Sequence, residues 1–389
     1  MSNLAISTAF DAGSIEVIKI DDHRDIQLAI RTDSASDIAQ WFYFRLHGAA
    51  GLPVTLHFMN ASQSAYPAGW DGYRAVASYD RRNWFRVPTQ YNGEQLTVNF
   101  TPLAQNVYLA YFEPYSWERH LDLLGYAAAR DGVTLEHLGK TLDGHDMDLL
   151  IIGAPGAGKK KVWLTARQHP GETMSEWFIE GLLERLLDLN DPVSRTLQSK
   201  CIFYVMPNMN PDGAVRGNLR CNATGVNLNR EWAAPSMECS PEVFLVREKM
   251  LITGVDLFLD IHGDEVLPYN FVSGSSGIPG YSERLEELEH AFKAAWLVSS
   301  PDFQSSFGYD DDKPGEANMG IANKWVCQQF DCLAYTIEMP FKDNAELPDE
   351  LHGWSGKRSK ILGASVLQPI LAVIDKVNHK NAEVVRSNF

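Results

Sequence analysis

The chain has 389 residues, which is long for one domain, so two domains are the first expectation. Hydrophobic residues make up 45% and charged residues 22%, which is typical of a globular protein and excludes a disordered or fibrous one. The formal net charge of −16 argues against nucleic-acid binding, because contacts to phosphates need a clustered basic surface.

The sequence also argues against a membrane or secreted protein. The segment MSNLAISTAFDAGS lacks a basic stretch followed by an apolar run, and no apolar stretch approaches the length of a membrane span. The five cysteines are odd in number, and free thiols in a reducing cytoplasm are their simplest interpretation. A disulfide between Cys221 and Cys239 is the alternative for an exported protein. We therefore expect a cytoplasmic protein.

Residues 1–115 predict an antiparallel β-sandwich domain. Short runs of alternating or β-branched residues recur there between Gly, Pro, Asn and Asp, namely SIEVIKI, DIQLAIRT, WFYFRLHG, PVTLHFMN, QLTVNF and NVYLAYF. Strands of this length and spacing are typical of a sandwich. The dense aromatic residues of WFYFRL and YDRRNWFRV are interpreted as its core, with a ligand platform as the alternative.

Residues 116–389 predict an α/β domain. Ser116 is a candidate N-cap for a helix through SWERHLDLLGYAAAR. Apolar strands are expected at KVWLTARQ, CIFYVMPNMN, VDLFLDIHG and CLAYTIEMPF, with helices at SEWFIEGLLERLLDL, PEVFLVREKMLI and YSERLEELEHAFKAAW. This alternation indicates a mostly parallel or mixed sheet covered on both faces, in which ligands bind outside the carboxyl ends of the strands.

Three of the predicted strands end in ionisable side chains. KVWLTAR is followed by His169 and Glu172, VDLFLDI by His262, and CLAYTI by Glu338. Two histidines and a glutamate form a common catalytic zinc site, which keeps one position open for water. A bare H-x-x-E pattern is frequent by chance, and a histidine in it can be a hydrogen-bonded loop residue. The ordered combination with the later strand is more specific and predicts a zinc site.

A polar, Gly-rich segment at residues 208–230 is unsuited to a core element. It contains NPDG and NLNR, with Arg216 and Arg220 between them. Arginine and asparagine side chains can together form a clamp for a carboxylate, in which Arg binds through two nitrogens and Asn adds a donor. From these residues alone, a solvated loop is an equally good interpretation.

The motifs HPGE, NPDG, RGNLRCNATGVNLNREW, DIHG and YTIEMPF, in this order, resemble the M14 zinc carboxypeptidases and most closely their cytosolic carboxypeptidase subfamily. That subfamily also carries a β-sandwich before its catalytic domain, and WFYFRL with YDRRNWFRV resembles it. The resemblance covers nearly the whole chain. It implies a mixed-sheet catalytic domain of the phosphorylase/hydrolase-like type that binds one zinc ion.

The resemblance assigns His169, Glu172 and His262 as the zinc ligands and Glu338 as the general base. If Glu338 were not the base, Glu265 beside the second histidine would be the next candidate.

The same resemblance assigns the residues that handle the substrate. Asn229 and Arg230 match the pair that binds the terminal carboxylate. Arg220 matches the arginine that polarises the scissile carbonyl, with Arg216 as the alternative. Tyr309 is a candidate for the tyrosine that covers the bound carboxylate, and a surface-loop tyrosine is the alternative.

Two positions depart from the family pattern. Digestive carboxypeptidases have arginine before the metal-binding glutamate, whereas this chain has Gly171, as the cytosolic subfamily does. Family members usually have aspartate where this chain has Asn227, as the partner of a zinc histidine. An amide can still accept a hydrogen bond from the imidazole, but without its charge the ligand should be less basic.

The implied function is a carboxypeptidase that hydrolyses residues from the C-terminus of peptides or proteins. A related zinc amidohydrolase or deacylase, acting on N-acyl amino acids or cell-wall peptides, is the enzymatic alternative. A non-catalytic zinc or protein-binding module is the alternative of another class, and the presence of Glu338 argues against it. The cytosolic subfamily often favours acidic C-terminal residues such as glutamate, and the sequence leaves open whether this chain shares that preference. The sequence does not indicate an oligomeric state.

Overall fold

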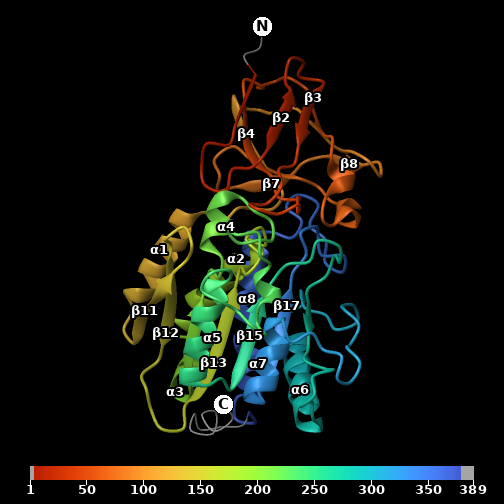
Figure 1. The fold of residues 1–389 in the computed structure, drawn as a ribbon. Helices are drawn as coiled ribbons and strands as arrows, with labels where there is room; N and C mark the ends of the chain where they lie inside the picture. The colour runs from red at the N-terminus through yellow and green to blue at the C-terminus, as the bar shows by residue number, and fades with distance from the viewer. Residues whose placement is uncertain (1–3, 378–389) are drawn as a thin grey trace.

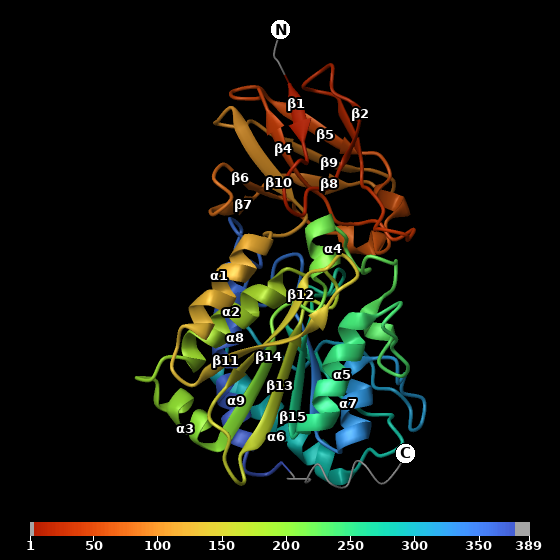
Figure 2. The same ribbon diagram turned by 60° about the vertical axis from the view of Figure 1, so that its left-hand side comes forward.

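The computed structural model describes residues 4–377 and forms two domains, with the N-terminal domain at one end of the larger second domain (Figures 1 and 2). The last strand of the first domain, β10, ends at Ala110, and the first helix of the second, α1, begins at Trp117. The division between residues 115 and 116 stays a prediction. Residues 378–389, which were assigned to the second domain, lie outside the described residues.

The N-terminal domain consists of two five-stranded sheets. In the first, the strand order is β1 (Ala5–Ser7), β4 (Tyr43–His47), β10 (Asn106–Ala110), β6 (Val76–Ser78) and β7 (Trp84–Arg86). In the second, it is β2 (Glu16–Lys19), β3 (Ile26–Ala29), β5 (Val54–Phe58), β9 (Leu96–Phe100) and β8 (Thr89–Tyr91). The pairing is antiparallel as predicted except between β3 and β5, which are parallel.

The aromatic residues of this domain form its core. Phe44 of β4 and Phe58 of β5 lie in different sheets, and their ring centroids are 6.3 Å apart. Trp41 and Phe42 are also almost fully buried. The sequence interpretation of these rings as core residues is therefore confirmed, because the rings fill the space between the sheets.

The second domain is built on one mixed seven-stranded sheet. Its strands, in spatial order, are β11 (Val133–Lys140), β12 (Asp146–Ile152), β14 (Cys201–Met206), β13 (Lys160–Ala166), β15 (Leu257–Ile261), β17 (Leu333–Glu338) and β16 (Phe271–Ser273). The four strands β14, β13, β15 and β17 run parallel, and the other three run antiparallel to their neighbours. All four strands predicted from the sequence in this domain are present.

Helices cover both faces of this sheet, because its buried strands are apolar on both sides. Trp163 and Phe258 face α5 and α7, whereas Leu164 and Leu259 face the opposite layer. The helices are α1 (Trp117–Ala128), α2 (Met174–Leu186), α3 (Pro192–Lys200), α4 (Pro211–Arg216), α5 (Pro241–Thr253), α6 (Glu283–Ser299), α7 (Ala322–Phe330), α8 (Gly356–Ser365) and α9 (Leu367–Val373). Ser116 caps α1 as predicted, since its hydroxyl accepts from the backbone N–H of Arg119.

The two domains are joined by buried polar and aromatic contacts. Arg86 at the end of β7 donates to the carbonyl oxygens of Phe341 (2.8 Å), Trp354 (3.0 Å) and His352 (3.1 Å) in the second domain. The ring of Tyr111 stacks on that of Phe341 at 4.5 Å. These contacts fix the N-terminal domain over the edge of the seven-stranded sheet where β17 ends.

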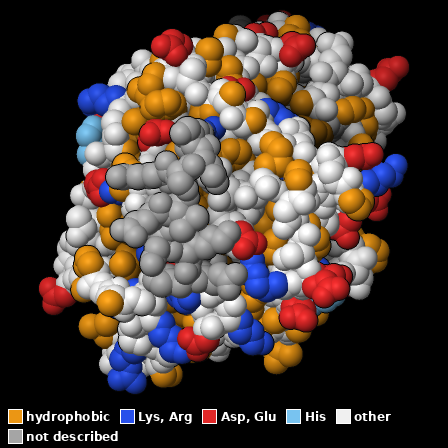
Figure 3. Space-filling view, turned by 60° about the horizontal axis from the view of Figure 1, so that its bottom comes forward, with side chains coloured by type: hydrophobic (Ala, Val, Ile, Leu, Met, Phe, Trp, Pro, Cys, Tyr) orange, Lys and Arg blue, Asp and Glu red, His pale blue; other side chains and the backbone are white. Residues whose placement is uncertain are grey.

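The opposite end of the molecule, brought forward in Figure 3, carries both acidic and basic side chains, and neither kind covers the visible surface continuously. None of the helices within residues 4–377 combines the length and apolar character needed to cross a membrane. All five cysteines are free thiols, and the alternative pair Cys221 and Cys239 is not bonded.

Candidate metal centre

The parallel strands β13, β15 and β17 are adjacent, so their carboxyl ends lie at one edge of the sheet. The backbone N–H of His262 donates to the carbonyl of Ile337 at 2.8 Å, which continues the pairing of β15 with β17. Because Glu338 follows Ile337, this pairing places Glu338 beside His262. The three strand ends therefore lie together at one edge of the sheet, as predicted.

The turn that carries the first two candidate ligands begins with a strained residue. Arg167, directly after β13, has a φ of 59°, a left-handed value that is unfavourable for a residue with a side chain. Its buried guanidinium donates to the carbonyl of Pro170 at 3.0 Å and to Glu176 at 2.7 Å. These bonds hold the bend through which the chain leaves the strand and turns toward Glu172.

Gly171 is required by the close approach of another loop. Its N–H donates to the carbonyl of Leu219 at 2.8 Å. A Cβ atom at Gly171 would lie 2.9 Å from Cδ1 of Leu219 and 3.0 Å from its Cα atom. This contact gives a physical reason why the turn has glycine where digestive carboxypeptidases have arginine.

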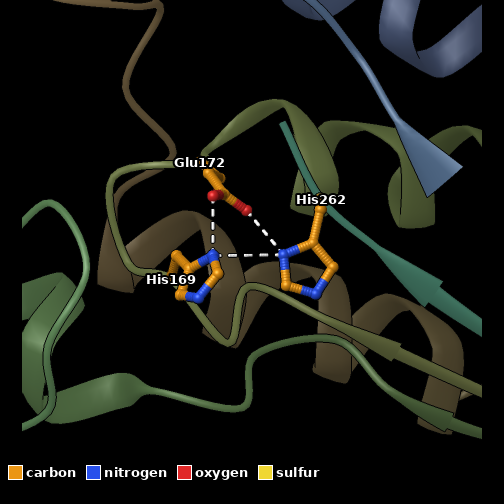
Figure 4. Close-up of side chains that lie close together, drawn as sticks. All are labelled: His169, Glu172 and His262. Carbon is orange, nitrogen blue, oxygen red and sulfur yellow. Dashed lines mark hydrogen bonds and ion pairs between the residues drawn. The ribbon is translucent and has the colours of Figure 1, made fainter. Parts of the chain in front are cut away.

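His169, Glu172 and His262 are buried and point toward one another (Figure 4). Nδ1 of His169 lies 2.7 Å from one carboxylate oxygen of Glu172, and Nδ1 of His262 lies 2.8 Å from the other. The two Nδ1 atoms are 3.2 Å apart, and the ligand atoms of all three residues lie within 4.8 Å of one another. The structure thus brings together the three residues predicted as zinc ligands.

The outer nitrogen of each histidine faces an oxygen acceptor. Nε2 of His169 lies 3.0 Å from the side-chain oxygen of Asn227, and Nε2 of His262 lies 2.8 Å from a carboxylate oxygen of Asp260. These partners assign the proton of each neutral ring to Nε2. Both Nδ1 atoms are then bare lone pairs facing a carboxylate, an arrangement that needs a cation between them.

The pKa shifts of the two histidines also indicate that the cluster favours a cation. Burial and the nearby Arg220 lower the pKa of His169 to about 4, so this ring is neutral at physiological pH. Burial alone would lower the pKa of His262, but Asp260 and Glu172 outweigh it and raise that pKa well above the usual range. The acidic groups around His262 thus favour a positive charge at the cluster.

Sequence reasoning missed the buried network behind His262. Asp260 accepts from the hydroxyl of Thr165 at 2.7 Å and from the amide of Gln168 at 2.5 Å, and Gln168 accepts from Trp232 at 2.9 Å. The sequence held one signal, because residues two apart on a strand point to the same face. An aspartate two residues before a ligand histidine is thus placed on the same face as that histidine.

Glu338 is buried, and its hydrogen bonding leaves part of its carboxylate available. One of its carboxylate oxygens lies 3.4 Å from the hydroxyl of Tyr309, and the other is buried with no hydrogen-bond partner among the described residues. Burial raises its pKa well above the usual range, and the carboxylates of Glu172 and Glu265 add to this effect. Glu265, the alternative base, is buried as well, and burial with Glu172 nearby raises its pKa to about 8.

Tyr309 lies at the site and is not simply a surface-loop residue. Its hydroxyl donates to Asp264 at 2.5 Å, and its ring packs edge-on against Phe271 with centroids 4.9 Å apart. Half of the residue is nevertheless exposed. A side chain with an exposed ring and a hydroxyl beside Glu338 can contact both a substrate and the reacting groups.

Asn229 and Arg230 follow Asn227 in a short 3₁₀ helix, Leu228–Arg230. The side-chain oxygen of Asn229 is used by the backbone N–H of Ala322 at 2.8 Å, and its nitrogen faces Nε2 of His262 at 3.4 Å. Because Nε2 of His262 already donates to Asp260, it cannot accept from Asn229, whose amide donor is therefore left for a ligand. Arg230 is exposed and places one nitrogen 2.6 Å from the carbonyl of Asn229.

The two candidate arginines for the scissile carbonyl lie in different surroundings. Arg216 forms a bidentate ion pair with Asp143, at 2.6 and 2.7 Å, and does not join the other site residues. The side chain of Arg220 interacts electrostatically with Glu172, Glu265 and Glu338, and within residues 4–377 its guanidinium has no hydrogen-bond acceptor. Arg216, which the sequence left open as the alternative to Arg220, therefore does not lie at the candidate metal centre.

The N-terminal domain also contributes to this site, which sequence reasoning did not anticipate. The guanidinium of Arg220 lies 5.4 Å from the ring centroid of Tyr66, and its backbone is bound by Asp33 at 2.7 Å. Both residues belong to the first domain and are more than 150 positions before Arg220 in the chain. Nothing in their local sequence signals such a contact.

Two family models match the chain. Residues 6–112 match the cytosolic carboxypeptidase N-terminal domain, and residues 123–362 match the zinc carboxypeptidase domain. An uncharacterized protein of Zymomonas mobilis is 48% identical, with 96% of this chain and 97% of that protein covered.

Solved structures are similar over almost the whole chain. A putative carboxypeptidase A from Shewanella denitrificans is 52% identical, with a TM-score of 0.95, and covers 96% of this chain and 100% of its own. A metallo-carboxypeptidase from Pseudomonas aeruginosa, solved in complex with (2-guanidinoethylmercapto)succinic acid, is 47% identical. Its TM-score is 0.93, and the same shares of the two chains are covered. Both domains and their arrangement thus recur in these proteins.

Proposed function

Because the chain belongs to the M14 zinc carboxypeptidase family, with the N-terminal domain of the cytosolic carboxypeptidases, we propose that it is a zinc carboxypeptidase that releases C-terminal residues from peptides or proteins. The observation that carries the proposal is the cluster of His169, Glu172 and His262 beside the unpartnered carboxylate oxygen of Glu338. The deep burial of a cluster that needs a cation supports a bound metal as its occupant.

The donor set fits one zinc ion. Two imidazole nitrogens and a carboxylate are its usual protein ligands in hydrolytic enzymes, and acceptors behind both rings hold the ligand atoms toward the centre. A bound zinc ion would supply a Lewis acid that makes a water molecule more acidic and polarises a carbonyl. His169, Glu172 and His262 would hold it.

Glu338 is proposed as the general base. Its free carboxylate oxygen can take a proton from the attacking water and then deliver it to the leaving amine. Glu338 is attached to the rigid strand β17 next to His262, so its distance from the cluster is fixed by the sheet. Its raised pKa suits a group that must hold a proton between these two steps.

Four side chains are proposed to contact the substrate. Arg230 and the free amide donor of Asn229 bind the terminal carboxylate, and Tyr309 covers it. Arg220 donates to the scissile carbonyl oxygen as negative charge develops there. The positive charge of Arg220 also lowers the pKa of Arg230, behind the larger effect of burial, which indicates that the two guanidinium groups are close enough to share an anionic ligand.

The ligand of the Pseudomonas aeruginosa relative is a derivative of succinic acid, so it carries two carboxylates. By similarity, we propose that the site of this chain also accepts a free carboxylate. The proposal includes a cytoplasmic location, as for the family that shares the N-terminal domain, and no membrane or nucleic-acid partner.

A peptide library analysed by mass spectrometry tests the proposal. The purified protein, loaded with zinc, should shorten free-acid peptides from the C-terminus and leave their C-terminally amidated counterparts intact. Equal cleavage of both forms would contradict the proposed binding of the terminal carboxylate by Arg230 and Asn229. Hydrolysis of N-acyl amino acids without hydrolysis of peptides would instead favour the deacylase alternative, and no zinc-dependent hydrolysis at all would favour a binding module.

A further inference from the structure

The loop that carries Arg220 is anchored by a carboxylate of the other domain. Asp33 lies in the loop after β3, and only 4% of its surface is exposed. Its carboxylate accepts from three consecutive backbone N–H groups, those of Leu219 (2.6 Å), Arg220 (2.7 Å) and Cys221 (2.9 Å). Hydrogen bonds to an ionised acceptor are short and strong, so this contact fixes the backbone of the loop.

Asp33 is itself held in place. Its N–H donates to the carbonyl of Ile38 at 2.7 Å, which closes its own loop. The neighbouring Ser34 donates its N–H to the side-chain oxygen of Asn218 at 3.0 Å, directly before the anchored segment. This second bond joins the two loops directly beside the first contact, so Asp33 has little freedom to move away from Arg220.

A second residue of the N-terminal domain orients the side chain of Arg220. The ring of Tyr66 lies under its guanidinium at 5.4 Å, within the range of a cation–π contact. The backbone of Tyr66 is fixed on both sides by Gln40, whose oxygen accepts from the Tyr66 N–H at 2.8 Å and whose nitrogen donates to the Tyr66 carbonyl at 3.1 Å.

The guanidinium of Arg220 is not tied down by acceptors. No carboxylate or carbonyl of residues 4–377 accepts a hydrogen bond from it, although Glu172 and Glu338 are near enough to affect its charge. Its donors are thus left for a ligand, and its position depends on the anchored backbone and on the ring of Tyr66. An arginine bound by a carboxylate would be as well fixed but could not offer the same donors.

We propose that Asp33 and Tyr66 are positioning residues of the active site, through which the N-terminal domain aims Arg220 at the scissile carbonyl. This inference rests on the proposed function, in which Arg220 stabilises the developing oxyanion. The first domain then completes the catalytic machinery and does not merely cover it. Because an oxyanion donor acts mainly in the transition state, its misplacement should lower kcat more than it raises KM.

The first test compares Asp33→Ala with Arg31→Ala. Arg31 lies two residues earlier and also bonds the second domain, through the carbonyl of Arg216 at 2.7 Å, but it does not touch the anchored loop. We expect kcat of Asp33→Ala to fall about tenfold to a hundredfold, since loss of one oxyanion donor costs roughly a hundredfold or more. Arg31→Ala should keep its kcat, and both variants should keep their zinc.

A double-mutant cycle separates positioning from general damage to the fold. If Asp33 acts through Arg220, Asp33→Ala should cost almost nothing in kcat when Arg220→Ala is already present. Hydrogen exchange measured on residues 218–222 should also accelerate in Asp33→Ala and not in Arg31→Ala. Additive losses of kcat in the cycle, or equal losses in Asp33→Ala and Arg31→Ala, would overturn the role of Asp33.

Tyr66 gives a second test that does not depend on Asp33. Tyr66→Phe keeps the ring and should keep kcat within about twofold, whereas Tyr66→Leu loses the cation–π contact and should lower kcat about tenfold. Equal activity in the two variants would contradict the positioning role of the ring. Failure of the unmodified protein to cleave any free-acid peptide would refute the proposed function itself, whereas normal cleavage with unaffected variants would refute only this inference.

Discussion

Asn227 faces His169 with its side-chain oxygen, 3.0 Å from Nε2, and the same oxygen accepts from the backbone N–H of Asn229 at 3.0 Å. The second bond fixes the orientation of the amide, so that its oxygen and not its nitrogen meets the imidazole. The neutral amide thereby takes the place that an aspartate has in many relatives. It keeps the proton on the outer nitrogen of His169 without adding a negative charge.

The first prediction follows from this bond. Replacing Asn227 with alanine should weaken zinc binding roughly tenfold to a hundredfold, because partners behind a ligand histidine contribute about this much. Asn227→Asp should bind zinc more tightly than the unmodified protein, since a carboxylate makes the ring more basic. Competition with a zinc chelator measures both. Asn190→Ala, on an exposed turn, serves as the control, and unchanged affinity in Asn227→Ala would contradict the role.

The second prediction separates the two buried glutamates at the site. Glu338→Gln should lower kcat by about a hundredfold to ten-thousandfold while zinc content stays normal, because the amide cannot accept the proton. Glu265→Gln should have a much smaller effect, since the pairing of β17 with β15 holds Glu338, the proposed base, directly beside His262. Kinetics and elemental analysis of the same samples provide the measurement. A reversed order of the two effects would make Glu265 the base.

The third prediction uses Arg216 as the matched control for Arg230. Arg230→Ala should raise KM for free-acid peptides about tenfold to a hundredfold, because the charged partner of the terminal carboxylate is lost. Arg216→Ala removes an ion pair with Asp143 outside the site and should leave KM unchanged. Steady-state kinetics on one peptide compares the two variants. A higher KM in Arg216→Ala alone would instead place Arg216 among the residues that contact the substrate.

The fourth prediction concerns pH and stability. Burial raises the pKa of Glu242 to about 7, against an unfolded value of 4.5. The folded state therefore holds this proton more tightly, so its contribution to stability is complete below pH 4.5 and is lost as pH rises through 7. The loss amounts to about 3 kcal/mol at most, from 1.36 kcal/mol per pKa unit.

Glu242→Gln should remove this pH dependence, because the amide stays neutral. Urea unfolding at pH 5 and pH 8 should show a smaller difference in the free energy of unfolding for Glu242→Gln than for the unmodified protein. Glu238→Gln is the control, because Glu238 is exposed and lies shortly before α5, the helix that contains Glu242. An unchanged difference in Glu242→Gln would show that Glu242 does not carry the effect.

Sequence patterns predicted the elements that are long and strongly apolar. The strands at residues 160–166, 201–206, 257–261 and 333–338 were found because each contains an unbroken run of at least five buried and mostly apolar residues. The pair β11 and β12 was missed, because β11 has no fully buried residue and both strands carry charged residues among their apolar ones. Helices α8 and α9 were missed as well, since glycine and proline interrupt their apolar pattern.

Some residues of the candidate site could likewise be predicted from the sequence, and others could not. His169, Glu172 and His262 are readable from the sequence because each lies next to the end of a parallel strand, and strand ends of one sheet must meet at one edge. Asp33 and Tyr66 are not readable, because their role depends on how the first domain docks on the second. That docking is set by interdomain contacts such as those of Arg86, which no local pattern encodes.

The sequence by itself therefore indicated the family and the two domain types, and it predicted the candidate metal ligands and the candidate base, all of which depend on short motifs and strand order. The tertiary structure decided which arginine reaches the site, which orientation Asn227 adopts and which residues of the first domain touch Arg220. Motifs act through neighbours in the chain and in the sheet. Contacts between domains depend on the shapes of two folded surfaces, which exist only after each domain has formed its core.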